Sequence, residues 1–275
     1  MPRISGKQRI SSMGKVLAIR RDDTFSPHSI GKDKAILMAV LQRLGDCQLM
    51  DERVFDDALK IPEADAYLSM GRFPKTLERL SQIEKKGKVV VNRGESVCPR
   101  YVLEDLMRKH QVAMPPEKGT HGYWLKNGGW ATGKDDVVFC QDEQQLREAL
   151  SRYRERGITH QVVSAHVVGD LVKWYAVGDS FFRYYYPNDD GISKFGDERR
   201  NGQAHHYPFD VEALHQEVVK VARLTGIDVY GGDAIIDQDG NFYVIDFNDW
   251  PSFSRCREQA ADAIADLVSR YLNEK

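Results

Sequence analysis

Three oxygen-bearing side chains stand close together in the last third of the sequence. Asp233 follows two glycines in YGGDAIID, and Asp246 and Asn248 follow in FYVIDFN, after the turn QDGN. Asp-Gly between β-rich segments predicts a hairpin, and alternation along a strand puts Asp246 and Asn248 on one face. Pairing across the turn brings Asp233 alongside them. Such oxygens suit a hard cation such as Mg²⁺, with phosphate oxygens and water completing its coordination.

The alternative is that Asp233 begins a strand and that Asp246 and Asn248 are solvated edge residues. These two residues, however, interrupt an otherwise apolar segment, YVIDFNDWPSF. A polar pair in such surroundings is costly unless it has partners. The sequence therefore favours metal binding.

Basic residues in two loops could bind phosphate or another anion. Lys126 ends the segment GYWLK just before Gly128 and Gly129, where a lysine can reach phosphates that the loop amides cover. Arg200 and Asn201 lie in a long polar loop, and the planar fork of arginine suits anion capture. The alternatives are an exposed lysine and a solvated basic loop.

The segment QVVSAHVVGDLVKWYAVG carries the remaining candidates. Gln161, Val162 and Val163 could form a hinge strand whose backbone meets a purine edge, and Lys173 points from a later strand toward what the sheet holds. His166 could line the site or be structural. The many aromatic residues nearby could stack on nucleic-acid bases, but aromatic residues in strands more often pack in the core.

The surrounding sequence predicts an α/β region, then an α+β region, then a sheet-rich end. Strand and helix patterns alternate over residues 13–95, which predicts a small lobe with a parallel sheet. Dense β-branched and aromatic residues predict antiparallel sheet over residues 159–186. Apolar spacing and breakers predict helices at residues 32–44, 74–86, 100–111, 143–156, 211–225 and 258–272.

Composition excludes several classes of protein. The 275 residues are 41% hydrophobic and 29% charged, as in globular proteins. The net charge is -2, which gives no basic field for nucleic acid, and no segment approaches the ~18 apolar residues of a membrane span. The 4 cysteines are scattered, which is typical of a reducing cytosol. We therefore expect a cytoplasmic protein that binds neither nucleic acid nor membrane.

The order of these residues is similar to that of the ATP-grasp superfamily. The segment YGGDAIIDQDGNFYVIDFNDWPSF closely resembles the terminal metal-binding hairpin of that superfamily. The pattern of that hairpin is an acidic residue, any residue, Asn and then Pro. RimK-type glutamate ligases give the nearest pattern, because their first ATP lysine stands fifteen residues before a proline, as Arg100 does before Pro115. The resemblance, which spans about residues 75–255, implies that Lys126 and the residues at 161–163 (Gln161, Val162, Val163) also bind ATP.

The same resemblance implies the metal site and the catalytic residues. Metal binding falls on Asp233, Asp246 and Asn248, and catalytic roles fall on Lys173, Arg200 and Asn201. Magnesium is the expected metal, and manganese could replace it. The basic and polar first residues, MPRISGKQRISS, predict a disordered tail over residues 1–13. The resemblance further implies an ATP-grasp fold of α/β and α+β parts, with residues 14–98 a pre-ATP-grasp lobe, 99–163 the small lobe and 164–275 the large lobe.

Some positions depart from the ligase pattern. Arg100 stands where the ligases have a lysine, and Asp246 stands where they usually have a glutamate. Val162 takes the place of an acidic residue in the hinge strand, and Leu171 takes the place of an aspartate near the ribose. Asp-x-Asn together with Lys173 instead resembles the inositol-polyphosphate kinases of the same superfamily.

Three functions follow, in order of preference. The first is an ATP- and magnesium-dependent ligase that joins a carboxylate to an amine through an acyl phosphate, with a small molecule or a peptide terminus as the acceptor. The second is a small-molecule kinase that phosphorylates a hydroxyl. The third is a nucleotide-binding module without catalysis.

Overall fold

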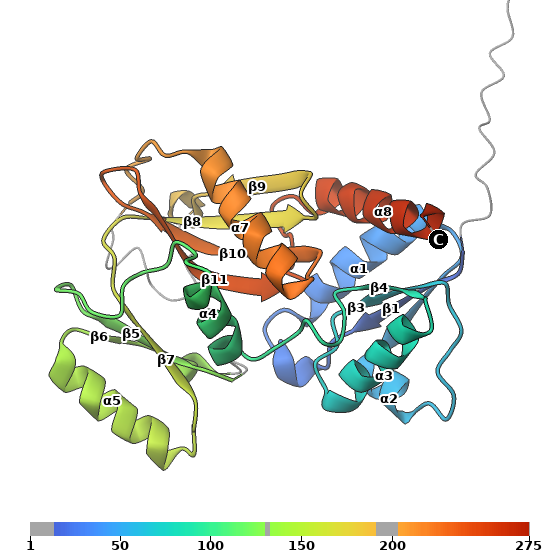
Figure 1. The fold of residues 1–275 in the computed structure, drawn as a ribbon, viewed down its shortest axis with the longest axis horizontal. Coiled ribbons are helices and arrows are strands. Elements are labelled where there is room, and N and C mark those ends of the chain that lie inside the picture. Colours follow the sequence, from blue (N-terminus) through green and yellow to red (C-terminus); the bar gives the residue numbers. More distant parts are fainter. Residues whose placement is uncertain (1–13, 130–132, 191–202, 275) are drawn as a thin grey trace, which may run out of the picture.

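The computed structural model describes residues 14–129, 133–190 and 203–274. Within these residues the strands form three sheets, two of four strands and one of three. Figure 1 shows the three sheets in separate regions of the molecule, each with helices against it. We call them the first, second and third sheet in the order of the chain. The mixed α/β and α+β architecture that the sequence predicts is confirmed.

The first sheet is parallel throughout, in the order β2-β1-β3-β4. Its strands are β1 (Val16–Arg20), β2 (Cys47–Asp51), β3 (Ala66–Ser69) and β4 (Val89–Val91). The helices around it are α1 (Ile30–Leu44), α2 (Glu52–Asp57) and α3 (Pro74–Lys85), with a 3-10 turn, η1 (Asp23–Phe25). Together they form what we call the first lobe. The predicted parallel sheet is confirmed, although β2, α2 and β3 have no counterpart among the predicted elements.

Both faces of the first sheet are covered, which explains the continuous apolar sequence of β1. Val16 and Ala18 pack in a core that includes residues of α1. Leu17 and Ile19 pack on the other face with residues of α2 and α3. The core on the α1 side also includes residues of the last helix, α8 (Arg257–Asn273), which lies beside α1 in Figure 1.

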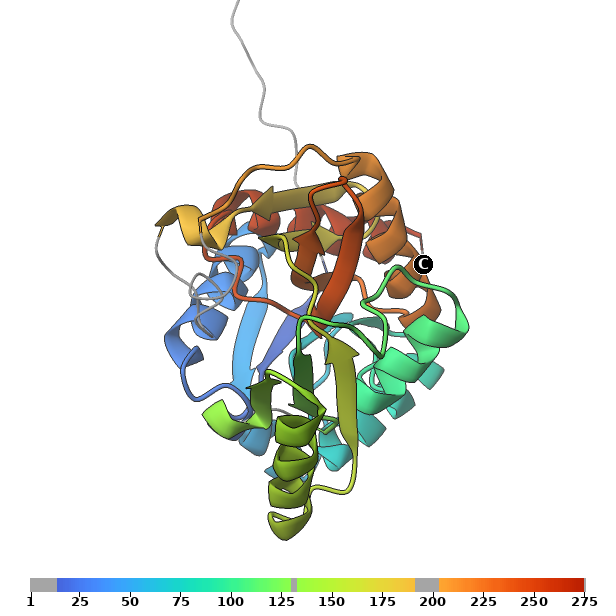
Figure 2. The same cartoon turned by 90° about the vertical axis from the view of Figure 1, so that its left-hand side faces the viewer.

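The second sheet is antiparallel, in the order β6-β5-β7. Its strands are β5 (Tyr123–Asn127), β6 (Val137–Cys140) and β7 (Gln161–Ala165), with a 3-10 turn, η2 (Lys134–Asp136), before β6. Helix α5 (Glu143–Glu155) packs Tyr153 against Tyr123 and Leu125 on one face. Figures 1 and 2 show α5 at the outer end of the molecule, so the other face is turned toward the third sheet.

The third sheet is antiparallel, in the order β11-β10-β8-β9. Its elements are β8 (Asp170–Val177), β9 (Phe181–Tyr185), η3 (Pro187–Asp190), α7 (Val211–Thr225), β10 (Val229–Ile236) and β11 (Phe242–Asp249). Residues of α7 and of α4 (Arg100–Lys109) cover one face. There Trp174 is fully buried beside Tyr230 and Phe247, so these strand aromatics are core residues.

Antiparallel sheet is found as predicted over residues 159–186, but the strands belong to two sheets. All of β7 pairs with β5 in the second sheet, whereas β8 and β9 belong to the third. The four cysteines are free thiols. Across the described helices, none combines the length and apolar character needed to cross a membrane. The predicted tail at residues 1–13 lies outside the described residues.

Candidate functional site

The β10–β11 hairpin brings the three candidate metal ligands together. Asp233 of β10 lies directly opposite Asp246 of β11. Asn248 lies two residues further along β11, on the same face as Asp246. The turn between the strands is closed by Asp237, whose carboxylate accepts hydrogen bonds from the backbone N–H groups of Asp239 and Asn241. The juxtaposition expected from the Asp-Gly turn and the alternation is therefore present.

A β-bulge gives β11 its mixed exposure. The pairing register shifts so that Ile245 has no direct partner on β10. Val244 and Phe247 both pack in the core on the α7 side, whereas Asp246 faces the opposite side. A β-carbon at Gly232 would lie 2.0 Å from the carbonyl oxygen of Asp246. The two strands therefore approach closely at a position where only glycine fits.

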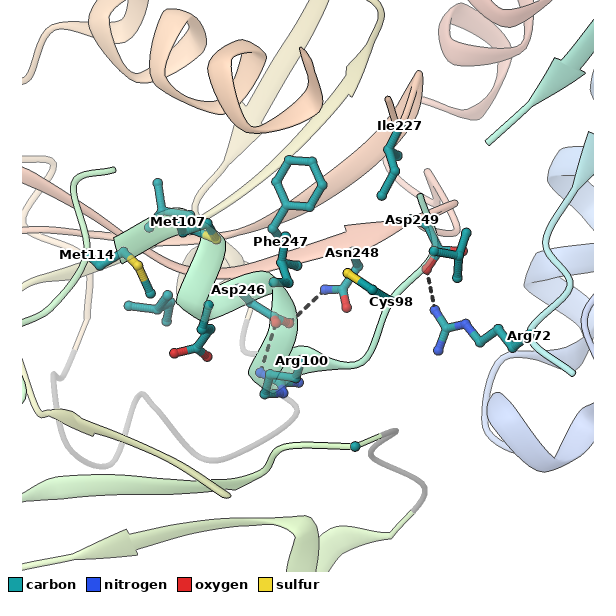
Figure 3. A pocket seen from close by; sticks show the side chains of 16 residues that line it. Arg72, Cys98, Arg100, Met107, Met114, Ile227, Asp246, Phe247, Asn248 and Asp249 are labelled. Carbon is teal, nitrogen blue, oxygen red and sulfur yellow. Dashed lines mark hydrogen bonds and ion pairs between the residues drawn. The ribbon is translucent and has the colours of Figure 1, made fainter. Parts of the chain in front are cut away.

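Each of the two candidate metal-binding carboxylates is paired with a basic side chain. Arg100 Nη1 lies 3.1 Å from Oδ1 of Asp246, and Lys173 Nζ lies 2.6 Å from Oδ1 of Asp233. Asn248 Nδ2 donates a 2.7 Å hydrogen bond to Oδ2 of Asp246. Figure 3 shows Arg100 and Asn248 reaching Asp246. Both carboxylates are therefore held in place by donors of the protein itself.

These pairs keep the site charged at neutral pH. Burial alone would raise the pKa of Asp246, but the positive charges of Arg100 and Lys126 lower it to about 2. Burial alone would lower the pKa of Lys173, but the charge of Asp233 and the hydrogen bond between the two raise it. Asp246 is therefore ionised and Lys173 protonated, the forms that metal binding and phosphate binding require.

Lys126 reaches across from the second sheet to the third. Its side chain ends in an Nζ that donates a 2.5 Å hydrogen bond to the carbonyl oxygen of Ile245, the bulge residue. Lys126 is only 9% exposed, so the interpretation of a simply exposed lysine is wrong. Burial lowers the pKa of Lys126, as does the neighbouring charge of Arg100.

Arg100 is the first residue of α4, and the glycine turn after β5 fixes this end of the helix. The backbone N–H of Tyr101 donates to the carbonyl oxygen of Gly128 at 2.8 Å. The backbone N–H of Gly128 donates in turn to the carbonyl oxygen of His160 at 2.9 Å. The rings of Tyr101 and His160 stack with centroids 4.1 Å apart. The start of α4, the glycine turn and the start of β7 therefore form one unit, which brings Arg100 near Lys126.

The predicted hinge residues lie on β7 beside Lys126. Val162 pairs directly with Lys126 across the strands, so the two side chains share the face turned toward the third sheet. Val163 packs on the opposite face, against the core beside α5. Gln161 begins the strand and is exposed.

His166 follows β7 and is buried. Trp124 Nε1 donates a 3.1 Å hydrogen bond to Nδ1 of His166, and the ring of Phe139 stands edge-on to the imidazole at 5.4 Å. These contacts hold His166 in an aromatic cluster and favour the structural interpretation of this residue.

Arg200 and Asn201 lie outside the described residues. After residue 202 the chain is anchored on Asp170 at the start of β8. The carboxylate of Asp170 accepts hydrogen bonds from the backbone N–H groups of His205 at 2.7 Å and Tyr207 at 3.0 Å.

The donors on the hairpin fit a hard divalent cation but do not complete its coordination. Asp233, Asp246 and Asn248 provide two carboxylates and an amide oxygen, the ligand types that Mg²⁺ prefers. In the described part of the chain, no group of three or more His, Cys, Asp and Glu side chains could hold a metal. A metal on this hairpin therefore needs further oxygen ligands, such as phosphate and water.

A pocket of about 100 Å³ lies along β11, beside α4. Figure 3 shows Met107 and Met114 toward one end and Arg72 toward the other, with Arg100 and Asp246 between them. The remaining lining residues are Val97, Cys98, Leu103, Glu104, Gly129, Ile227, Val244, Ile245, Phe247, Asn248 and Asp249. The pocket thus has an apolar part and a strongly charged part.

The charged part includes residues that sequence analysis missed. Glu104 stands one helical turn after Arg100 and is 9% exposed, and burial raises its pKa. Arg72, from the loop after β3, forms a 2.6 Å ion pair with Asp249 at the end of β11. The helical spacing of Arg100 and Glu104 could have indicated the first of these, but no local signal links Arg72 to Asp249.

Comparison with known proteins identifies the fold. The sequence matches no family model and no curated protein. The structure is similar to the D-alanine–D-alanine ligase of Bacillus anthracis complexed with ATP, at 11% identity and a TM-score of 0.64, covering 96% of this chain and 99% of that one. It is also similar to an ATP-grasp RimK-domain protein of Sphaerobacter thermophilus, at 17% identity and a TM-score of 0.60, covering 92% and 99%.

A third similar structure is the ATP-grasp ligase PsnB complexed with a minimal precursor, Mg and ADP. The identity is 12% and the TM-score 0.60, covering 94% of this chain and 98% of that one. At these identities the likeness shows the fold and nothing more. The fold is that of the ATP-grasp proteins, as the sequence resemblance implied.

Proposed function

We propose that this chain, which has the ATP-grasp fold, is an ATP- and magnesium-dependent ligase that joins a carboxylate to an amine. One observation carries the proposal. Asp233 and Asp246 lie opposite each other with Asn248 beside them, and Arg100 and Lys126 meet this hairpin from α4 and the second sheet. Acids that suit a metal and cations that suit phosphate are thus combined in one site.

Different residues of the site would bind the metal and the phosphate groups. Asp233, Asp246 and Asn248 would hold the magnesium ion, which when bound neutralises phosphate charge. Arg100 and Lys126 lie within reach of the same place and would bind phosphate oxygens. Manganese could replace magnesium, because its preference for oxygen ligands is similar.

The nucleotide base would lie beside β7. The strand residues at positions 161–163 (Gln161, Val162, Val163) would offer backbone groups to the purine edge, with Val162 on the same face as Lys126. Lys173, paired with Asp233, would stabilise charge on the transferring phosphoryl group. Arg200 and Asn201 are proposed to act on the same group.

The reaction would take place in two steps. A carboxylate oxygen of the substrate attacks the γ-phosphorus of ATP, and ADP leaves, which gives an acyl phosphate. An amine then attacks the acyl carbon and a C–N bond forms, while inorganic phosphate leaves and the amine nitrogen loses a proton. Neither step needs a nucleophilic side chain, because positioning and charge stabilisation supply the catalysis.

The similar solved structures support a ligase, and they differ in the substrates that their names describe. Among them are a D-alanine–D-alanine ligase with ATP and PsnB with a minimal precursor, Mg and ADP. We therefore propose a small molecule or a peptide terminus as the acceptor. The spacing of Arg100 and Pro115 resembles that of the RimK-type glutamate ligases. We therefore include amino acids of the glutamate type among the proposed substrates.

A small-molecule kinase is the second candidate. Asp246 takes the place of the ligase glutamate, and Lys173 takes the place of an arginine and pairs with Asp233. This combination resembles the inositol-polyphosphate kinases, in which a hydroxyl would accept the phosphoryl group.

An ADP-release assay over a panel of acceptors tests both candidates. The panel contains amino acids, peptides and phosphorylated polyols, each with Mg²⁺ and ATP. ADP release that requires both a carboxylate and an amine supports the ligase, whereas a phosphorylated hydroxyl product would identify a kinase. No Mg²⁺-dependent ATP binding by calorimetry, with no effect of Asp246→Ala, would exclude both enzymes.

A further inference from the structure

A network of buried and half-buried charged residues lies between the first lobe and the end of β11. Its members are Arg21, Asp33, Glu52, Arg72 and Asp249. Glu52 is completely buried, and Asp33, Arg21 and Asp249 are each no more than 6% exposed. Arg21 follows β1 and Arg72 follows β3. Because β1 and β3 are parallel neighbours, both arginines come from the same edge of the first sheet.

Glu52 holds the two loops that carry the arginines. Its Oε2 accepts a 2.9 Å hydrogen bond from the backbone N–H of Asp22. Its Oε1 accepts bonds of 2.5 Å from the N–H of Arg72 and 2.6 Å from that of Phe73. A β-carbon at Gly71 would lie 3.0 Å from Oε1, so this loop packs closely on the carboxylate. The positions of both arginines are therefore fixed within the first lobe.

From this base the arginines reach the two residues that follow Asn248. Arg72 Nη2 lies 2.6 Å from Oδ1 of Asp249, and Figure 3 shows this contact at one end of the pocket. Arg21 Nη2 donates a 2.6 Å hydrogen bond to the carbonyl oxygen of Trp250. One arginine thus binds a side chain and the other binds the backbone.

The backbone at the end of β11 needs such support. Trp250 has a φ of 41°, a conformation that is costly for any residue other than glycine. Its N–H donates to the carbonyl oxygen of Val229 at 2.9 Å, and its ring is 1% exposed. Because Asn248 is only two residues earlier, the constraint on Trp250 also constrains Asn248.

Stability alone does not account for this network. Burying paired charges removes their hydration, and an apolar pair of similar volume is often equally or more stable. A charged pair fixes direction, however, because the arginine fork and the carboxylate meet in a defined geometry. A partner that hydrogen-bonds a metal ligand directly typically changes metal affinity by about 10- to 100-fold when it is removed. Arg72 and Arg21 act on Asn248 through the adjoining backbone of β11.

We propose that Arg72 and Arg21 are positioning residues, through which the first lobe holds the Asn248 end of β11 in the orientation that binds the metal–nucleotide complex. The inference rests on the proposed function, since it concerns the same hairpin. It adds a role for the first lobe, which supplies none of the proposed metal ligands.

The test compares two ways of removing the ion pair. Arg72→Met combined with Asp249→Leu replaces the pair by apolar side chains of similar volume, so we expect the fold to be retained. Asp249→Asn keeps an oxygen acceptor for Arg72. Mn²⁺ binding in the presence of AMP-PNP is measured by electron paramagnetic resonance, and AMP-PNP binding without metal by calorimetry. We expect about a tenfold or greater loss of Mn²⁺ affinity in the double variant and less than about threefold in Asp249→Asn.

Arg43→Met is the matched control. Arg43 also links the first lobe to the C-terminal part of the chain, through ion pairs with Glu258 and Asp262 of α8. It does not contact the hairpin in those pairs, so Arg43→Met should leave Mn²⁺ affinity unchanged even if the protein becomes less stable.

Two results would overturn the inference while leaving the proposed function intact. One is wild-type Mn²⁺ affinity in the double variant. The other is an equal loss of AMP-PNP affinity without metal, which would mean that Arg72 contacts the nucleotide directly. If wild-type protein binds no Mn²⁺ with AMP-PNP, the proposed function itself fails, and the inference fails with it.

Discussion

Lys126 and Ile245 join the second and third sheets directly. The ammonium group of Lys126 donates a 2.5 Å hydrogen bond to the carbonyl oxygen of Ile245, the residue that the β-bulge adds to β11. Lys126 is thereby held, largely out of water, beside Arg100 and Asp246. The bulge thus affects both sheets, because it orients Asp246 and also provides the acceptor for the lysine.

Replacing Lys126 should mainly weaken nucleotide binding. Lys126→Met removes a charge-assisted contact to phosphate, worth about 1.5–3 kcal/mol, so we expect the ATP dissociation constant to rise about 10- to 100-fold. Calorimetry with AMP-PNP measures this change. Lys109→Met, at the exposed end of α4, is the control and should bind as the wild type does. An unchanged ATP affinity in Lys126→Met would remove this residue from the site.

Loss of either metal ligand on β11 should abolish turnover and preserve the fold. Asp246→Ala and Asn248→Ala each remove an oxygen ligand, and the charge stabilisation lost with the metal is several kcal/mol. We expect at least about a hundredfold decrease in ADP release, with an unchanged circular-dichroism spectrum. Asp239→Ala, at the exposed turn of the same hairpin, should retain activity. Wild-type turnover in Asp246→Ala would place the chemistry elsewhere.

The metal should bind together with the nucleotide and only weakly without it. Asp233 and Asp246 are already paired with Lys173 and Arg100, so a free divalent cation must compete with two internal cations. We expect Mn²⁺ alone to bind wild-type protein at least about tenfold more weakly than in the presence of AMP-PNP. Lys173→Met, which frees Asp233, should strengthen binding of Mn²⁺ alone. Electron paramagnetic resonance measures both affinities.

Lys220→Met provides the control for that experiment. Lys220 pairs with Glu217 on α7, so its loss should leave Mn²⁺ binding as in the wild type. Equal affinity for Mn²⁺ with and without AMP-PNP in wild-type protein would contradict the prediction.

Stability should depend on pH through Asp22, which lies in the loop beside Arg21. Burial alone would raise the pKa of Asp22, but hydrogen bonds from Arg53 and Thr24 lower it from 3.8 to about 2. Because the folded pKa is below the ordinary value, ionised Asp22 stabilises the fold above pH 3.8, and this contribution is lost as the pH falls toward 2. The variant Asp22→Asn has no ionisable carboxylate at this position, so it should lack this pH-dependent contribution to stability.

Urea unfolding of wild-type protein and Asp22→Asn at pH 7 and pH 2.5 measures this effect. The wild type should be the more stable at pH 7, and the difference in unfolding free energy should decrease at pH 2.5. A difference that is the same at both pH values would show that the charge of Asp22 does not contribute.

The hairpin could be predicted because its determinants are local. A short Asp-Gly turn predicts that β10 and β11 pair as an antiparallel hairpin, and Asp233 does lie beside the polar residues of β11. The bulge at Ile245 places Asp246, and not Ile245, opposite Asp233. It could not be predicted, since nothing in the sequence FYVIDFN marks an extra residue. The strands β2 and β3 have five and four residues, and segments so short show little periodicity of their own.

The rest of the candidate site depends on contacts between distant residues. Arg72 and Asp249 are 177 positions apart, and nothing near either residue identifies the other. Glu104 lies on a helix whose exposed and buried faces could be assigned, but its burial depends on how α4 meets β11. Arg200 and Asn201, which the resemblance implicated, lie outside the described residues and stay predictions.

The packing of α8 against α1 has a consequence for protein synthesis. One face of the first sheet is covered partly by Ala260, Ile264 and Val268 of α8. While a ribosome is still making the chain, the part of that face that α8 covers stays exposed until these residues have left the exit tunnel. We expect the lobe that is made first to reach its native state last, and to depend until then on chaperones that shield apolar surface.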